Sequence, residues 1–254
     1  MLLDATECSC QGRFELGNAY LIWLGGNTPR SVVPSVPLRL AASADAREHG
    51  GMGIISADVF LTLDGVYQAP GGPDEDPSGG FPFGGWQGAY WSDEGGEVVG
   101  ADLERLDALL LGRRTYDIFA AYWPQQDDEI GAKFNAVPKF VASRTIGDPD
   151  WAGTAVVRDP AAELTEVKAR FEEIHVIGSG ELTRALIAAD LLDRLHLYVY
   201  PIVLGRGRRL FDGVVPAAFR LSEPARTLPE GAVSLVYERA GVPVTGIDIG
   251  ELDG

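Results

Sequence analysis

Residues 175–182 read His-Val-Ile-Gly-Ser-Gly-Glu-Leu, and this stretch decides the fold. The apolar run at 174–177 predicts a buried strand, and residues 181–192 predict a helix. Between them, Gly178-Ser179-Gly180 predicts a tight turn whose glycines would let a ligand approach the backbone closely. Position 183 is Thr, so the third glycine of the G-x-G-x-x-G dinucleotide fingerprint is absent. The turn therefore fits a pyrophosphate-binding bend and a purely structural bend equally well.

Strand and helix patterns alternate along the chain on both sides of this turn. Near-continuous apolar strands separated by helices are typical of a largely parallel sheet that is covered on both faces. Asp159-Pro160 predicts a helix start, with Asp as the N-cap and Pro at the first helical position. The late strands have no helix between them and predict an antiparallel edge, with Val233, Leu235 and Tyr237 facing inward. The predicted strands span 54–63, 108–111, 139–143, 154–157, 174–177, 195–204 and 233–238, and the predicted helices span 98–107, 115–122, 160–171 and 181–192.

Two further strand ends carry arginine. In the segment 110–116, LLGRRTY, we expect Thr115 to cap a helix whose N-terminus is flanked by Arg113 and Arg114. A phosphate at such a terminus would meet backbone N–H groups, a hydroxyl and guanidinium groups together. Ser143-Arg144-Thr145 follows another strand and could receive an adenosine 2′-phosphate. Because ligands gather at the carboxyl ends of strands in open α/β sheets, these motifs predict one shared anion site, although a solvated basic turn at 110–116 remains an alternative.

The net charge of −16 and the pI of about 4.5 exclude nucleic acid and anionic membranes as expected partners, because both would repel the surface. No apolar run near the start approaches the ~20 residues that a spanning helix needs. Acidic Asp4 and Glu7 stand where a signal peptide would be basic, so we expect a cytoplasmic protein. The two cysteines, Cys8 and Cys10, form half a metal site at best, and no spacing of ligands predicts a metal.

The patterned part of the chain runs from 52 to 240 and suits one domain. Residues 1–51 lack periodicity and predict either a disordered leader or an over-long gene prediction, with the natural start of the protein close to Met52. Residues 241–254 predict a flexible acidic tail. The long segment 69–96 is rich in Gly, Pro and aromatic residues, which favours packing over a site rather than disorder.

The order of these motifs resembles the dihydrofolate reductase superfamily, and most closely the bacterial branch that contains the reductase domain of riboflavin biosynthesis, the RibD C-terminal domain. The resemblance covers about residues 53 to 240. It implies a dihydrofolate-reductase-like three-layer α/β/α sandwich, with a mostly parallel sheet and an antiparallel C-terminal edge, and a homodimer. The residues that carry it are Thr62-Leu63-Asp64-Gly65, LGRRTY at 111–116, VASR at 141–144, VIGSGEL at 176–182 and LYVYPIVLG at 197–205.

The resemblance also implies NADPH as the cofactor. Arg113 would lie near the 2′-phosphate, Thr115 at the pyrophosphate, and Ser143 and Arg144 at the adenosine end. The turn at 178–182 would lie under the pyrophosphate and the nicotinamide. The full set of implied cofactor-binding residues is Gly112, Arg113, Arg114, Thr115, Ser143, Arg144, Gly178, Ser179, Gly180, Glu181 and Leu182.

The reaction would also need a proton donor and a substrate pocket. The candidate catalytic acids are Asp64, which ends the first strand, and Asp93 or its neighbour Glu94 at a helix start. A turn-forming Asp-Gly and a solvated helix start are the alternatives for these positions. The candidate substrate-binding residues are Thr62, Trp86, Tyr90 and Tyr116, and the aromatic residues of the long loop could equally anchor it. His175 and His196 lie on predicted strands, where packing is the more frequent role.

Three functions remain open. The first is an NADPH-dependent reductase that transfers hydride to a small heterocyclic or carbonyl substrate. The second is the riboflavin-pathway reductase of 5-amino-6-(5-phosphoribosylamino)uracil, against which stands the lack of an evident extra phosphate-binding cluster. The third is a non-enzymatic NADP-binding module whose long aromatic loop recruits a partner.

Overall fold

The computed structural model describes residues 53–248. The predicted leader and the last residues of the predicted tail lie outside this range. Residues 241–248 follow the last strand without joining a helix or strand. No helix within residues 53–248 is long and apolar enough to cross a membrane.

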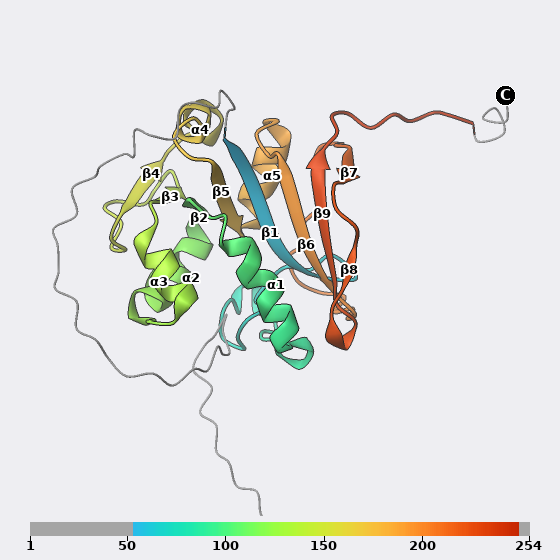
Figure 1. Cartoon of the computed structure of the whole chain (residues 1–254), viewed down its shortest axis with the longest axis horizontal. Helices are drawn as coiled ribbons and strands as arrows, with labels where there is room; N and C mark the ends of the chain where they lie inside the picture. Colours follow the sequence, from blue (N-terminus) through green and yellow to red (C-terminus); the bar gives the residue numbers. More distant parts are fainter. Residues whose placement is uncertain (1–52, 249–254) are drawn as a thin grey trace, which may run out of the picture.

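The core of the molecule is one mixed sheet with the strand order β4-β3-β2-β5-β1-β6-β9-β7, and β8 pairs with β9 (Figure 1). The pairs from β4 through to β6 are parallel, whereas β9 runs antiparallel to β6, β7 and β8. The predicted parallel sheet with an antiparallel C-terminal edge is therefore confirmed. The strands are β1 (Ile54–Thr62), β2 (Ala108–Gly112), β3 (Lys139–Ala142), β4 (Thr154–Val157), β5 (Glu173–Ile177), β6 (Arg194–Tyr200), β7 (Phe219–Leu221), β8 (Arg226–Thr227) and β9 (Val233–Arg239).

Helices cover both faces of the sheet. On one face, Leu164 of α4 (Pro160–Lys168) and Leu186 of α5 (Gly180–Ala188) pack in the same cluster as Ile55 of β1. On the other face, α1 (Asp93–Leu103), α2 (Arg113–Tyr122) and α3 (Glu129–Ala136) share a cluster with Leu109 of β2. The alternating side-chain direction along a strand explains this division. The result is the predicted dihydrofolate-reductase-like α/β/α sandwich.

Several element boundaries differ from the predictions for local reasons. α1 begins at Asp93 rather than 98 because the Ser92 hydroxyl accepts a hydrogen bond from Gly95 N–H and caps the helix. α2 begins at Arg113, so its N-cap is Gly112 and the prediction that Thr115 caps it is wrong. β6 ends at Tyr200, before Pro201, which has no N–H to continue the ladder. The predicted cap of α4 is confirmed, because Asp159 accepts from the N–H groups of Ala161 and Ala162.

The inward face of β9 was also predicted incompletely. Val233, Leu235 and Tyr237 are half-buried, whereas the alternate residues Ser234 and Val236 are fully buried. Both faces of β9 are covered, because Leu235 and Tyr237 pack against the core on one side while Ser234 reaches buried His196 on the other. The helix α3 and the short strands β7 and β8 were not predicted.

Candidate functional site

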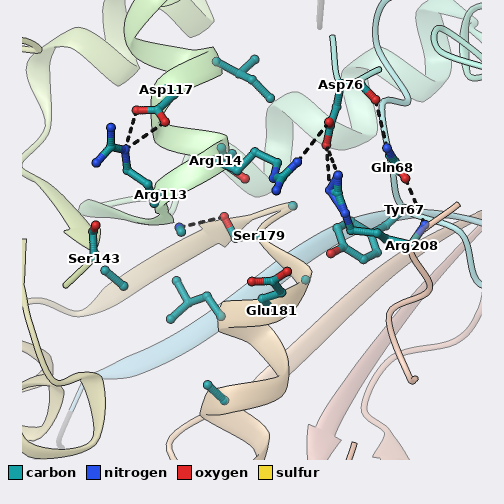
Figure 2. A pocket seen from close by; sticks show the side chains of 18 of the residues that line it. Tyr67, Gln68, Asp76, Arg113, Arg114, Asp117, Ser143, Ser179, Glu181 and Arg208 are labelled. Carbon is teal, nitrogen blue, oxygen red and sulfur yellow. Dashed lines mark hydrogen bonds and ion pairs between the residues drawn. The ribbon is translucent and has the colours of Figure 1, made fainter. Parts of the chain in front are cut away.

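A cleft of about 600 Å³ lies at the carboxyl ends of β2, β3 and β5 (Figure 2). Every residue that was predicted to bind the cofactor lines it, from Gly112–Thr115 through Ser143 and Arg144 to Gly178–Leu182. Parallel strands bring these segments to one edge of the sheet, as the motif positions required. The structure thus brings the three motifs together, while their roles in binding remain predictions.

Ser179 forms a hydrogen bond that connects the turn at 178–180 to the turn at Gly112. Its hydroxyl accepts a hydrogen bond from Gly112 N–H and donates one to Ile177 O, each at 3.0 Å. Ser179 has a φ of 48°, in the left-handed region that is costly for a residue with a Cβ. The preceding Gly178 is also left-handed, and a Cβ added to it would lie 4.0 Å from Thr115 Oγ1. The turn therefore holds the start of α5 against the start of α2.

Both helices begin at the cleft without a side-chain cap. The N-cap of α2 is Gly112, which has no side chain, and the N-cap of α5 is Ser179, whose hydroxyl does not bond to its helix. The first N–H groups of a helix lack partners within it and carry a partial positive charge. Two such ends in one cleft provide a local positive potential on a chain whose net charge is −16. The cleft is therefore suited to an elongated anion.

The arginines that line the cleft differ in whether they already have partners within the described residues. Arg113 is paired with Asp117 one turn along α2, with Nε 2.8 Å from Oδ1. Arg158 donates to the carbonyls of Ser143 and Ile146, at 2.9 and 2.7 Å, and so braces the loop after β3. Arg144 is exposed and makes no hydrogen bond or ion pair within residues 53–248. Arg144 is consequently the cleft arginine most available to an incoming phosphate.

The end of the cleft opposite Ser143 is formed by residues that sequence analysis missed (Figure 2). The Tyr67 ring lies against Gly180, where an added Cβ would be only 2.4 Å from Tyr67 Cζ. Burial raises the pKa of Tyr67 in spite of the nearby Arg184 and Arg208, so its hydroxyl stays protonated. Tyr67 lies four residues beyond the end of the predicted first strand, and no sequence pattern indicated that it meets the turn at 178–180.

Two arginines hold the segment after Tyr67 in place. Arg208 Nη1 and Nη2 both lie 2.9 Å from Asp76 Oδ2, and Arg114 Nη1 lies 3.3 Å from Asp76 Oδ1. Ser78 accepts from both guanidinium groups. Gln68 donates to the carbonyls of Asp76 and Ser78, each at 3.0 Å. The run Arg206–Arg209 in an acidic chain was the sequence feature that could have drawn attention to Arg208.

A second recess of about 470 Å³ adjoins this end of the cleft. Gln68, Arg114 and Arg208 line both spaces, and Arg206 is added in the recess. Within residues 53–248, Arg206 makes no hydrogen bond or ion pair. The fold therefore brings Arg114 together with Arg206 and Arg208 in a basic cluster beside the cleft.

Asp64 does not fit the predicted role of a catalytic acid. Oδ1 accepts from Thr62 Oγ1 at 2.7 Å and from Leu204 N–H, and Oδ2 accepts from Gly205 N–H and Arg209. Although burial acts to raise it, these hydrogen bonds hold the pKa of Asp64 far below its usual range. The carboxylate stays ionised, does not line the cleft and joins β1 to the segment after β6.

The other predicted catalytic and substrate residues are also placed away from the cleft. Asp93 and Glu94 are exposed in the first turn of α1. Thr62 is buried and accepts from Val66 N–H. The Tyr116 hydroxyl accepts from Trp151 N–H at 3.1 Å inside the α2–α3 side of the core. None of these residues lines the cleft, because their polar groups are used within the fold or face solvent.

The aromatic segment packs on the sheet rather than forming a substrate wall. Trp86 Nε1 donates to Gln68 O at 2.8 Å, and the Trp86 and Tyr90 rings lie 5.6 and 6.2 Å from the Tyr200 ring. Phe81 and Trp86 are buried in the same cluster as Phe60. The prediction of a substrate role for Trp86 and Tyr90 is thus not supported, and the alternative of a structural anchor is.

The two histidines of the sheet are buried, and each lies beside a carboxyl group. His175 Nδ1 lies 2.7 Å from Asp58 Oδ2, and His196 Nδ1 lies 2.8 Å from Asp102 Oδ2. Burial alone would lower the pKa of His175, but Asp58 and Glu173 raise it to about 9. Neither histidine lines the cleft, in keeping with their predicted packing role. In the part of the chain that the structure describes, no group of acidic, His or Cys side chains could hold a metal.

Comparison with known proteins identifies the family. The uncharacterized protein YyaP of Bacillus subtilis is 26% identical over 197 residues, which cover 74% of this chain and 95% of YyaP. A solved protein from Shewanella sp. PV-4, provisionally assigned to riboflavin biosynthesis, has a TM-score of 0.54 at 20% identity, covering 73% of this chain and 98% of that one. RibD from Acinetobacter baumannii has a TM-score of 0.53 at 14% identity over 75% of this chain, which spans only 59% of RibD. Residues 54–230 match the model of the RibD C-terminal domain, and the chain belongs to that family.

Proposed function

We propose that this protein is an NADPH-dependent reductase that transfers hydride to a small heterocyclic or carbonyl substrate. Membership of the RibD C-terminal domain family supports a reductase-like role. The observation that carries the proposal is the convergence on one 600 Å³ cleft of two helix starts without a side-chain cap and of Arg144, which has no partner within residues 53–248. A dinucleotide with a pyrophosphate and a further phosphate matches these donors in charge and in number.

The residues of the cleft fit such a cofactor along its length. Gly112–Thr115 and Gly178–Leu182 would hold the pyrophosphate at the starts of α2 and α5, and Ser143 and Arg144 would hold the adenosine end with its 2′-phosphate. The Tyr67 end would then receive the nicotinamide and the substrate. When bound, NADPH supplies the hydride, so the protein itself must orient the two reactants and manage a proton.

The test is a fluorescence titration with NADPH and NADH, followed by absorbance assays over a panel of pterins, pyrimidines and carbonyl compounds. NADPH is expected to bind more tightly than NADH, because Arg144 would gain a phosphate partner. Turnover of at least one acceptor is expected. Equal affinity for the two cofactors would contradict the role of Arg144, and NADPH binding without any turnover would favour the non-enzymatic module.

A second candidate is reduction of 5-amino-6-(5-phosphoribosylamino)uracil, and the basic recess favours it. Arg206 is unpaired within residues 53–248 and lies with Arg114 and Arg208 beside the Tyr67 end of the cleft. A phosphate on the substrate could bind there while its ring reaches the cleft. Direct assay of this compound with NADPH, compared with its dephosphorylated nucleoside, tests the idea. A preference for the phosphorylated form is the expected result. Homodimer formation and a cytoplasmic location remain proposals that the family resemblance suggests.

A further inference from the structure

Two neighbouring carboxylates, Glu75 and Asp76, line the cleft in opposite electrostatic settings. Asp76 is held by the guanidinium groups of Arg114 and Arg208. Glu75 forms no ion pair within residues 53–248. Adjacent acids whose surroundings differ in this way can serve different roles in one site.

The Glu75 side chain is fixed by the backbone through one of its oxygens. Oε2 accepts from Gly71 N–H at 2.7 Å and from Gly72 N–H at 3.2 Å. In the described part of the chain, Oε1 has no hydrogen-bond partner, which leaves it free to meet a ligand. The carboxyl group is therefore held in one orientation by hydrogen bonds, without an ion pair in the described part of the chain. A proton-transferring group needs a fixed orientation of this kind.

The surroundings of Glu75 favour its protonated form. Burial raises the pKa of Glu75 to about 7, against the lowering effect of the two backbone N–H groups, and the negative charge of Asp76 acts in the same direction as burial. Two arginines that line the cleft from other elements, Arg114 of α2 and Arg208 of the segment after β6, are both bonded to Asp76. Tyr67 and Glu181 are the further titratable groups at this end of the cleft.

Glu75 lines the cleft and is the chain neighbour of a residue at the end where the proposed reaction would occur. It adjoins Asp76, which faces Arg208 and Gln68 at the end opposite Ser143 (Figure 2). If Ser143 and Arg144 hold the adenosine, a dinucleotide that extends along the cleft places its reactive ring at the Glu75 end. Other acids of the cleft are less suitable, because Asp117 is paired with Arg113 and Glu181 is exposed in the first turn of α5.

We propose that Glu75 is the proton donor of the reductase, with Oε1 directed at the heteroatom of the substrate double bond. This inference rests on the proposed function. The carbon of a C=O or C=N bond receives the hydride, the π bond breaks, and its electron pair on oxygen or nitrogen takes the proton from the Glu75 carboxyl. The substrate gains two electrons and two hydrogens, and the nicotinamide that supplies the hydride is oxidised. The Glu75 carboxylate then regains a proton from water.

The first experiment measures the pH at which the Glu75 carboxyl group loses its proton, in the full chain. Protein labelled with ¹³C at the glutamate carboxyl is titrated by NMR, and the Glu75 signal is assigned by its loss in Glu75→Gln. Its midpoint is expected near pH 7, well above that of the exposed glutamates, and NADP⁺ is expected to shift the signal. A midpoint of about 4.5, the ordinary value for Glu, would overturn the inference.

The second experiment separates binding from proton transfer. Glu75→Gln keeps the shape and the contact with Gly71, so its NADPH affinity should stay within about twofold of the wild type. Its kcat with the best acceptor of the panel should fall about 100-fold, and the loss of rate above pH 7 should disappear from its pH profile. Glu75→Asp should recover part of the rate. Asp74→Asn is the matched control, because Asp74 is exposed next door and does not line the cleft.

The outcomes distinguish this inference from the proposed function. A kcat of Glu75→Gln within about threefold of the wild type, with the same pH profile, would overturn the role of Glu75 alone. Failure of the wild type to bind NADPH would overturn both. NADPH binding with no acceptor reduced would also remove the proton donor, because the protein would then have no reaction to serve.

Discussion

Ser179 Oγ accepts a hydrogen bond from Gly112 N–H at 3.0 Å. The N-cap residue of α5 is therefore bonded to the N-cap residue of α2. The two helix starts are thereby set at a fixed separation. A pyrophosphate that bridges them would need that separation to be maintained. The bond lies between residues 67 positions apart in the sequence, which makes it a tertiary contact rather than a local cap.

Ser179→Ala should weaken this connection and lower the free energy of unfolding by about 1 kcal/mol, because a partly buried N–H loses its acceptor. Ser179→Gly loses the same bond but relieves the left-handed φ of 48°, so it should be the more stable of the two variants. Urea denaturation measures both. Thr145→Ala serves as the control, since Thr145 is exposed and does not line the cleft. Glycine and alanine variants of equal stability would contradict the strain at this position.

Arg144→Ala should reduce the affinity for NADPH about tenfold and leave that for NADH nearly unchanged. The reason is that a free guanidinium contributes about 1.4 kcal/mol or more when it gains a phosphate partner. Fluorescence titration at fixed ionic strength measures the change. Arg226→Ala removes the same charge from an exposed strand outside the cleft and is the matched control. An equal loss for both cofactors would mean that Arg144 does not recognise the 2′-phosphate.

Gly180→Ala should destabilise the fold by about 1–3 kcal/mol, because the new methyl group would lie 2.4 Å from the Tyr67 ring and the ring must move. The displacement should also impair NADPH binding. Thermal unfolding and cofactor titration measure the two effects. Gly147→Ala is the control, since an added Cβ there meets nothing within 4 Å. A stable variant with normal binding would show that Tyr67 is free to leave its position.

His175 should stabilise the fold in a pH-dependent way. Its pKa is raised from 6.5 in the unfolded chain to about 9 in the fold, so the folded state binds the proton more tightly. The stabilisation is fully present below pH 6.5 and is lost as the pH rises toward 9. Lys139 acts in the opposite direction, because burial lowers its pKa to about 8. The free energy of unfolding of the wild type should therefore be compared with that of His175→Gln, which isolates the histidine.

The difference between wild type and His175→Gln should shrink between pH 6.5 and 9. Parallel stability curves across that interval would show that the Asp58–His175 pair does not bind its proton more tightly in the fold.

The sequence was sufficient for seven strands of the sheet, without the short strands β7 and β8, and for the parts of the cleft that lie at strand ends. Gly112, Ser143 and Gly178 could be placed together because each follows an apolar strand, and parallel strands end at one edge. The role of Asp64 could not be predicted, because its partners Leu204 and Gly205 lie 140 and 141 residues away and only the fold brings them near. In the structure these hydrogen bonds favour the alternative reading of Asp64-Gly65 as a turn.

The cleft residues that the sequence did not predict were missed for one physical reason. Tyr67, Glu75 and Arg208 enter the cleft from irregular segments, where no periodicity indicates which way a side chain points. Their chemistry depends on burial and on unequal pairing, as the contrast of Glu75 with Asp76 shows, and neither quantity can be read from residue types. The sequence left two roles open for the aromatic residues of the same segment, because packing against the sheet and lining a pocket require the same kind of side chain.

The bonding of Asp76 by Arg114 and Arg208 has a consequence for what this end of the molecule can admit. The two guanidinium groups are already paired with the single negative charge of Asp76. A ligand carboxylate that displaced Asp76 would bring the same charge and would gain little binding energy. A doubly charged phosphate would gain by the exchange, and its advantage should diminish as salt is added. We therefore expect phosphorylated ligands to bind at this end of the cleft better than small metabolites with one negative charge.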